Sequence, residues 1–129
     1  MSISYLLDSS VLILSLRQDA KTQKRIDDLT AVYISAIALG ELYHGAKHSV
    51  HVEKSVKEVH DLAQTATVLR ADIRTAVIYG QIKHEQRMKG QMLPDNDLWI
   101  AATAIQFGLT LAARDNHFTW IAELALEQW

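Results

Sequence analysis

The sequence predicts an α/β fold in which a mostly parallel central sheet is covered by helices. Short apolar runs alternate with longer segments of helical spacing along the 129 residues, and this alternation is typical of parallel strands that are joined by helices. The first run, residues 3–7, contains no charged side chain, as expected of a strand that is buried on both faces. The length is that of one ordinary domain, so we expect residues 1–129 to form a single unit.

The first part of the chain is predicted to contain two strand–helix units. After the first strand at residues 3–7, Ser9 and Ser10 are suited to cap a helix, because their side-chain oxygens can accept hydrogen bonds from free backbone N–H groups. Residues 31–34 are predicted to form a second buried strand, with Ser35 as the cap of the following helix. Two parallel strands with their helices would follow from this pattern.

Three further helices are predicted in the middle of the chain. Residues 17–28 are polar and indicate a short exposed helix. Two later stretches carry apolar residues at spacings of three and four, which marks one face of a helix. The inward-facing residues expected from this spacing are Val52, Val56, Val59 and Ala63 in the first stretch, and Ile73, Ala76, Val77 and Gly80 in the second. The second of these helices is expected to cover residues 71–89 and to end at Gly90.

The last third of the chain is predicted to begin with a helix opened by Pro94. A proline is well tolerated at a first helical position, because its missing N–H has no partner there. This helix is expected to reach Phe107 and to stop at Gly108. The elements expected after it are a third strand at residues 109–112, a short helix at residues 116–123 and a last strand near Leu126.

The composition describes an ordinary globular protein. Hydrophobic residues make up 49% of the chain and the formal net charge is −2, so nucleic-acid binding would depend on local basic residues rather than on the total charge. The absence of cysteine excludes disulfides, zinc knuckles and thiol catalysis. We find no pattern of a signal peptide or a membrane span, and we therefore expect a cytoplasmic protein without a membrane partner.

Four carboxylates stand where a parallel sheet brings ligands together. Asp8 and Asp115 follow predicted strands, Glu41 lies early in the helix after the second strand, and Asp97 begins the helix opened by Pro94. The carboxyl ends of parallel strands face the crevice in which such sheets bind ligands. Two unit charges ~4 Å apart interact by about 4 kcal/mol at an effective dielectric constant of about 20. Converging acids therefore favour a bound Mg²⁺ or Mn²⁺ ion.

Each acid also has an ordinary explanation. Asp8 and Asp115 could be helix caps, and Glu41 could be a solvated helix residue. Asp97 is more informative, because it begins an apolar helical stripe and a buried carboxylate is costly without a partner. Asp95, roughly 200° away around the helix, cannot share that face and is expected to stabilise the helix start through its dipole. Only the combination of the four acids points to a site.

Histidines and tryptophans offer weaker signals. His44, His48 and His51 could share a helical face with Glu41 and bind zinc or nickel, but exposed histidines are favoured, because Gly45 makes an unbroken helix uncertain. The tryptophans, expected to be core or interface residues rather than base-stacking platforms, are Trp99, Trp120 and Trp129.

The sequence around the four acids resembles the PIN-domain ribonucleases, and specifically the VapC toxins of toxin–antitoxin pairs. The matching segments are Leu7-Asp8-Ser9-Ser10, Glu41-Leu42-Tyr43-His44-Gly45, Asn96-Asp97-Leu98-Trp99-Ile100-Ala101-Ala102, Gly108-Leu109-Thr110-Leu111 and Arg114-Asp115 with Phe118. Their order and spacing cover nearly the whole chain. One departure is Ala113, where many relatives have threonine or serine, and it weakens the case for Asp115.

This resemblance implies a three-layer α/β/α sandwich and a metal-dependent endoribonuclease. Asp8, Glu41 and Asp97, assisted by Asp115, would hold one or two Mg²⁺ or Mn²⁺ ions. Ser9 would orient Asp8 or a water bound to the metal. These residues are therefore expected to be the catalytic and metal-binding set.

The resemblance also implies partners. The substrate would be RNA, for which the contact candidates are Arg114, Lys47 and Arg87, the last in a cationic helix end with Lys83 and Lys89. Solubility and helix-end stabilisation explain these basic residues equally well. A homodimer and a VapB-type antitoxin are expected, with an antitoxin arginine competing in the acidic pocket.

Other functions remain open at this point. The main alternative is a catalytically silent module that keeps the PIN fold for a partner, and another is a non-toxin metal-dependent phosphoesterase acting on DNA or a small ester. A phosphoacceptor receiver domain is a third possibility, although the later lysine that such a domain needs is not evident.

Overall fold

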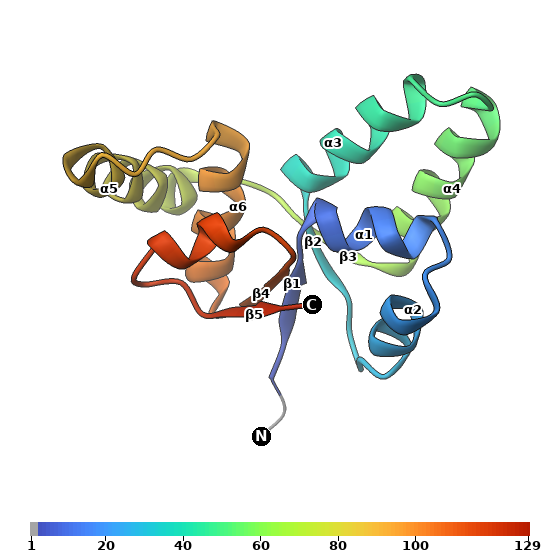
Figure 1. Ribbon diagram of the computed structural model, residues 1–129, viewed down its shortest axis with the longest axis horizontal. Coiled ribbons are helices and arrows are strands. Elements are labelled where there is room, and N and C mark those ends of the chain that lie inside the picture. Colours follow the sequence, from blue (N-terminus) through green and yellow to red (C-terminus); the bar gives the residue numbers. More distant parts are fainter. Residues whose placement is uncertain (1–2) are drawn as a thin grey trace.

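The computed structural model describes residues 3–129, which form a five-stranded parallel sheet between two layers of helices (Figure 1). The strand order is β3-β2-β1-β4-β5, and every neighbouring pair is parallel. The strands are β1 (Tyr5–Leu7), β2 (Tyr33–Ser35), β3 (Thr67–Leu69), β4 (Thr110–Ala113) and β5 (Leu126–Gln128). This arrangement confirms the α/β/α sandwich expected from the sequence. Because the strands are parallel, their carboxyl ends share one edge of the sheet.

The helices divide between the two faces of the sheet. They are α1 (Ser9–Leu16), α2 (Ala20–Asp27), α3 (Ala36–Lys47), α4 (Val52–Thr65), α5 (Ile73–Lys89), α6 (Asp95–Phe107) and the 3₁₀ helix η1 (Asn116–Trp120). In Figure 1, α1 to α4 lie on one side, and α5, α6 and η1 lie on the other. None of the helices within residues 3–129 is long and apolar enough to cross a membrane.

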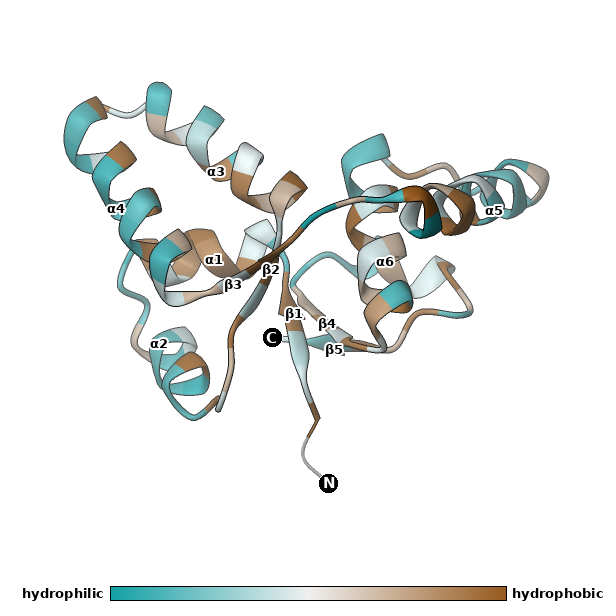
Figure 2. Ribbon diagram, turned by 180° about the vertical axis from the view of Figure 1, so that it is seen from behind, coloured by the Kyte–Doolittle hydropathy of each residue, from teal (hydrophilic) through white to brown (hydrophobic). Residues whose placement is uncertain are grey.

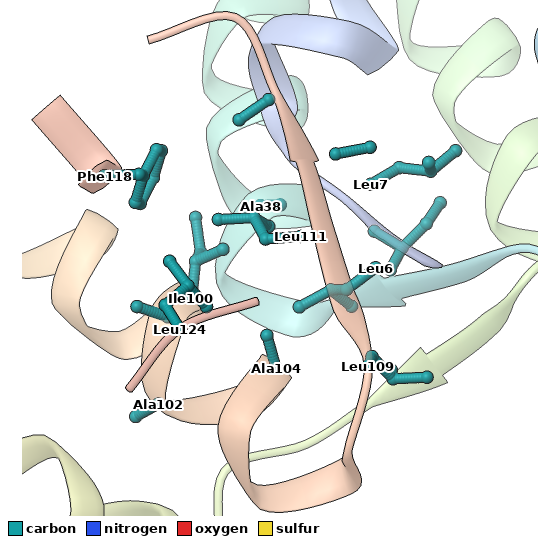
Figure 3. Close-up of a cluster of buried hydrophobic side chains, with 14 of the residues drawn as sticks. Leu6, Leu7, Ala38, Ile100, Ala102, Ala104, Leu109, Leu111, Phe118 and Leu124 are labelled. Carbon is teal, nitrogen blue, oxygen red and sulfur yellow. The ribbon is translucent and has the colours of Figure 1, made fainter. Parts of the chain in front are cut away.

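The core lies on both faces of the central strands. Leu6 and Leu7 of β1 and Leu111 and Ala112 of β4 are fully buried, as expected of strands covered on both sides. Figure 3 shows Leu6 and Leu111 among side chains contributed by α3 and α6. In Figure 2, hydrophobic residues are concentrated in the strands, whereas much of α2 and α4 is hydrophilic. The backbone at the carboxyl ends of β1 and β4 is therefore held by the best-packed part of the molecule.

The caps at the helix starts partly differ from expectation. The cap of α1 is Asp8 rather than Ser9 or Ser10, which form its first turn. A carboxylate at this position accepts from the free N–H groups and also favours the positive end of the helix dipole. Ser35 caps α3 as predicted, because its Oγ accepts from Ala38 N at 3.0 Å.

Two glycines end helices as the sequence predicts. Gly90 after α5 and Gly108 after α6 have φ values of 69° and 65°, in the left-handed region that favours glycine. The prediction for Pro94 was wrong by one residue, because Pro94 is the N-cap residue and α6 begins at Asp95. At this position the missing N–H of the proline still costs the helix no hydrogen bond.

The predicted inward stripe of α5 was wrong. Ile73 and Val77 are 82% and 68% exposed, and the helix instead buries Thr75, Ile82 and Gln86. Polar residues can be buried when their hydrogen bonds are satisfied. Thr75 Oγ1 bonds to Gln106, and Gln86 Nε2 donates to the Gln91 carbonyl at 3.2 Å. The burial of Ile82 in the core, together with these side-chain hydrogen bonds, sets the orientation of this helix.

Two elements near strand edges also differ from the sequence prediction. Strand β3 was missed, because it has three residues, half exposed, and directly follows the amphipathic pattern of α4. The short helix expected over residues 116–123 is the 3₁₀ helix η1, which ends at Trp120. Neither difference changes the edge at which the candidate site lies.

Candidate functional site

The carboxyl ends of β1 and β4 are joined by hydrogen bonds. Asp8 N donates to the Ala112 carbonyl at 2.9 Å. Just beyond the strands, Arg114 N donates to Ser10 Oγ at 3.2 Å. Asp8 and Asp115, which follow these two strands, are therefore held on neighbouring chain segments. The site begins at this pair of strand ends.

Asp8 is a buried carboxylate with one free oxygen. Its residue is 4% exposed. Its Oδ2 accepts from Ser10 N at 3.2 Å and from Ser10 Oγ at 2.6 Å, whereas its shielded Oδ1 has no partner among residues 3–129. Burial raises the pKa of Asp8, partly opposed by the hydrogen bonds from Ser10. An unpaired buried acceptor is costly, so this oxygen is suited to a ligand.

The serine whose side chain bonds to Asp8 is Ser10, and a backbone hydrogen bond from Ser9 also lowers the pKa of Asp8. Ser10 Oγ donates to Asp8 and accepts from Arg114 N, and it therefore connects the first acid to the segment that carries Asp115. The sequence prediction assigned this contact to Ser9, because both are small polar residues after the strand. The structure decides between them, because the second residue of α1 faces back to its cap.

Asp97 interacts with the other three acids. It lies half-buried in the first turn of α6, and its pKa is raised to about 6, first by burial and then by the charges of Asp8, Glu41 and Asp115. His117 acts in the opposite direction. The acids from β1, α3, α6 and the β4 end are thus close enough to repel one another. This electrostatic coupling is the main evidence for one site.

Glu41 is oriented with one oxygen away from solvent. It lies in α3 beside the buried Leu42, and its Oε1 is shielded without a hydrogen-bond partner among the described residues. The solvated position that is usual for a helical glutamate is therefore not found here. Together with Asp8 Oδ1, it gives the site two unsatisfied carboxylate oxygens.

Asp115 is both a cap and a member of the acidic group. Its Oδ1 accepts from His117 N at 2.9 Å at the start of η1 and lies 3.0 Å from His117 Nδ1. Its side chain is 44% exposed, more open than Asp8. His117 was not singled out from the sequence. The available signal was its position two residues after Asp115, because an aspartate cap accepts a hydrogen bond from a backbone N–H in the first turn.

The donor set suits a hard divalent cation. Mg²⁺ and Mn²⁺ prefer oxygen ligands at about 2.0–2.2 Å, and the group offers only carboxylate oxygens, two of them unpaired. Within residues 3–129, however, no three His, Cys, Asp or Glu side chains are gathered tightly enough to hold a metal ion. Charge repulsion acts over several ångströms, whereas coordination requires atoms around one point. The acids are therefore close enough to attract a cation, but their oxygens do not surround a single point.

The remaining candidates have other surroundings. His44, His48 and His51 are exposed, as favoured from the sequence, and His51 lies beyond the end of α3 at the start of α4. Asp95 is directed to α5, where it accepts from Lys83 Nζ at 2.9 Å and Tyr79 Oη at 2.8 Å. It was predicted to avoid the face of Asp97, but these contacts go beyond the expected dipole role.

The basic candidates are spread around the site. Arg114 Nη1 donates to the Trp129 carbonyl at 3.0 Å, which holds this guanidinium at the C-terminal strand. Lys47 is exposed in the last turn of α3, and Arg87 is exposed on α5. The structure thus brings the four acids together but not these three cations.

A groove leads away from Glu41 between α1, α3 and α4. Its volume is about 260 Å³. The apolar residues that line it include Ile13, Leu16, Leu42 and Val59, and the charged ones are Arg17, Glu41 and Glu58. This groove could not be predicted from the sequence, because its walls come from three separate helices.

The raised pKa of Asp97 predicts a pH-dependent stability. Between its ordinary pKa of 3.8 and about 6, the folded protein binds a proton more tightly than the unfolded chain, so stability falls as pH rises through this interval. The shift corresponds to at most about 3 kcal/mol, which solvent screening at a half-buried group reduces to about 2 kcal/mol.

Asp97→Asn removes this penalty. Metal-free urea unfolding should show the variant more stable than the parent above pH 6 and equal to it below 3.8; a difference that is constant with pH would contradict this.

Comparison with known proteins places the chain in a family. The PIN domain model matches residues 5–124. Ribonuclease VapC2 of Haemophilus influenzae is 28% identical over 98% of both chains, and the tRNA(fMet)-specific endonuclease VapC of Salmonella typhimurium is 27% identical over 98% of both. The solved structure of DNA-bound VapBC from Salmonella typhimurium contains a chain that superposes with a TM-score of 0.92 at 27% identity, covering 99% of each chain. The chain thus belongs to the PIN domain family, and its relatives there are VapC-type toxins.

Proposed function

We propose that this protein is the toxin of a VapBC-type toxin–antitoxin pair and acts as a Mg²⁺- or Mn²⁺-dependent endoribonuclease. The single observation that carries this proposal is the environment of Asp97, whose pKa is raised by burial and by the charges of Asp8, Glu41 and Asp115. Repulsion between acids at the carboxyl ends of parallel strands favours a bound cation. The ribonuclease names of the relatives support RNA as the substrate.

The four acids would hold the metal, directly or through bound water. Asp8 Oδ1 and Glu41 Oε1 are the unpaired oxygens, and Asp97 and Asp115 add charge around them. A bound Mg²⁺ or Mn²⁺ would supply polarisation of the scissile phosphate and activation of the attacking water. No protein nucleophile is needed.

Two further residues position these acids. Ser10 occupies Oδ2 of Asp8 and leaves Oδ1 available for a ligand. His117 restrains Asp115 through its backbone N–H and its ring nitrogen. Ser9, the residue named from the sequence, remains a candidate only for contact with a bound water. The phosphate-contact candidates Arg114 and Lys47 likewise remain predictions.

We further propose that a VapB-type antitoxin occupies the groove beside Glu41. The groove has apolar walls and a charged rim that includes Glu41, so a bound segment could place a basic side chain among the acids. The solved VapBC complexes that this chain resembles support such a partner. A homodimer, a single domain over residues 1–129 and a cytoplasmic location stay predictions from the sequence.

A silent PIN-fold module is the second candidate function. The specific observation in its favour is that no three of the described acids are gathered tightly enough for a metal ion. A phosphoesterase acting on DNA differs from the main proposal only in its substrate. One assay separates all three functions.

The test is incubation of the purified chain with a tRNA transcript and with single-stranded DNA, in buffer that contains Mn²⁺. We expect internal cleavage of the RNA and none of the DNA. Cleavage of neither substrate would favour the silent module, and cleavage of DNA alone would favour the other phosphoesterase. In a second arm, the product of the neighbouring reading frame is added, and we expect it to suppress RNA cleavage. An enzyme that cleaves RNA but is not inhibited would be a nuclease without the toxin role.

A further inference from the structure

The outward face of α5 carries a cleft with basic walls. The cleft has a volume of about 230 Å³ and is lined by Gly80, Lys83, His84 and Arg87. These residues are spaced by three and four positions and therefore share one face of the helix. No carboxylate is among its lining residues. The cleft is thus a local basic surface on a chain with a net charge of −2.

Lys83 connects this cleft to the helix that carries Asp97. Its Nζ donates to Asp95 Oδ1 at 2.9 Å and to Tyr79 Oη at 3.0 Å. These bonds raise the pKa of Lys83, so the ammonium stays charged. Asp95 is two residues before Asp97 in the first turn of α6. The basic cleft therefore borders the first turn of α6, on the side of that helix opposite to Asp97.

The junction between α5 and α6 is held firmly. Tyr79 stacks on Trp99 of α6 with ring centroids 4.0 Å apart and an interplanar angle of 10°, and Lys83 Nζ lies 5.4 Å from the centre of the Tyr79 ring. A cation over an aromatic face is further stabilised. Lys83 consequently loses little side-chain freedom when it meets a ligand, which favours binding.

The charge distribution identifies the ligand. A polyanion is repelled by four neighbouring acids unless cations flank them, and phosphate contacts supply most of the affinity of proteins for nucleic acids. Elsewhere, Arg114 is bound to the Trp129 carbonyl and Lys57 is paired with Asp61, as Lys83 of the cleft is with Asp95. Gly80 adds space, because a Cβ there would meet nothing within 4 Å. The basic cleft can therefore admit a phosphate group close to the helix.

We propose that the α5 cleft binds a backbone phosphate of the RNA strand, beyond the bond that is cleaved, through Lys83 and Arg87. This inference rests on the proposed function and adds the surface that guides the strand past the acidic group. It also gives a role to Arg87, which the sequence suggested only as a general substrate contact. The cleft provides charge and space but no base recognition, so its effect is independent of RNA sequence.

The test is the salt dependence of RNA binding. A fluorescein-labelled RNA stem-loop is titrated with the full chain carrying Asp97→Asn, which prevents cleavage, and with the same chain carrying Lys83→Gln and Arg87→Gln. Each lost phosphate contact lowers the slope of log K against log salt by about 0.7–0.9. We therefore expect the double variant to bind about tenfold more weakly, with a slope lower by about 1.5. Arg87→Gln alone keeps the Lys83–Asp95 pair and should give about half of this effect on the slope.

The matched control changes Lys21 and Lys24 of α2 to glutamine. These exposed residues carry the same total charge on the opposite side of the sheet (Figure 1). These control substitutions should leave the slope unchanged. An equal reduction of the slope in both double variants would mean that only net charge matters and would refute the cleft. Gly80→Leu is a second probe, because leucine favours a helix more than glycine but fills the cleft. It should weaken RNA binding without lowering stability.

Failure of the cleft and failure of the proposed function give different results. If the parent chain cleaves RNA but the α5 variants bind with unchanged slopes, only the cleft is wrong. If the parent neither binds nor cleaves RNA, both proposals fall.

Discussion

Asp97→Asn is expected to reduce RNA cleavage by about 1,000-fold or more while the fold stays intact. Asparagine has nearly the same shape but removes the charge and one anionic ligand for the cation, and interactions of this kind contribute several kcal/mol to phosphoryl and acyl transfer. Folding should not suffer, because the carboxylate is electrostatically unfavourable in the parent. Single-turnover cleavage and thermal unfolding, measured on the same preparation, check both parts.

Asp8→Asn should give a loss of similar size. Asparagine caps a helix as well as aspartate does, so α1 should remain, and the loss would then reflect the carboxylate itself. Asp61→Asn on α4 is the matched control, because it changes an exposed aspartate that pairs only with Lys57. Its cleavage rate should equal that of the parent. Normal cleavage by folded Asp8→Asn or Asp97→Asn would rule out the proposed site.

Removal of divalent metal should abolish cleavage, and added Mn²⁺ should restore it. The acids repel one another without a cation, so binding should also stabilise the fold: a ligand at about 100 times its Kd adds about 2.7 kcal/mol to the unfolding free energy. Thermal unfolding with and without Mn²⁺ measures this independently of activity. Asp97→Asn should lose most of the rise in Tm. Full cleavage in excess chelator would contradict a metal role, and an equal rise in Tm in the variant would place the bound ion elsewhere.

The sequence predicts the fold well where one physical effect dominates. Strands β1 and β4 are buried on both faces and therefore appear as mostly apolar runs without a charged residue, and Gly90 and Gly108 mark helix ends because of their left-handed backbone. The prediction for α5 was wrong because Thr75 and Gln86 satisfy their polar groups inside the protein. The periodicity of one helix cannot identify these partners, because Gln106 and the Gln91 carbonyl both lie outside the helix.

The candidate site could likewise be predicted from the sequence only in part. The four acids were predicted because parallel strands bring their carboxyl ends together, and Asp97 interacts with the other three. Ser10 was missed in favour of Ser9, because the choice depends on which hydroxyl turns back to the Asp8 carboxylate. The α5 cleft was also not predicted, since it needed the orientation of a helix that periodicity placed the wrong way round.

The strand order determines when the group of four acids can form during synthesis. β4 lies between β1 and β5 in the sheet, although β1 is made at the beginning and β4 only after α6. No segment shorter than the stretch from Asp8 to Asp115 contains all four acids. A nascent or truncated copy that stops before β4 therefore also lacks the strand that pairs with the second edge of β1. The group of four acids can therefore assemble only after translation has supplied both distant parts of the chain.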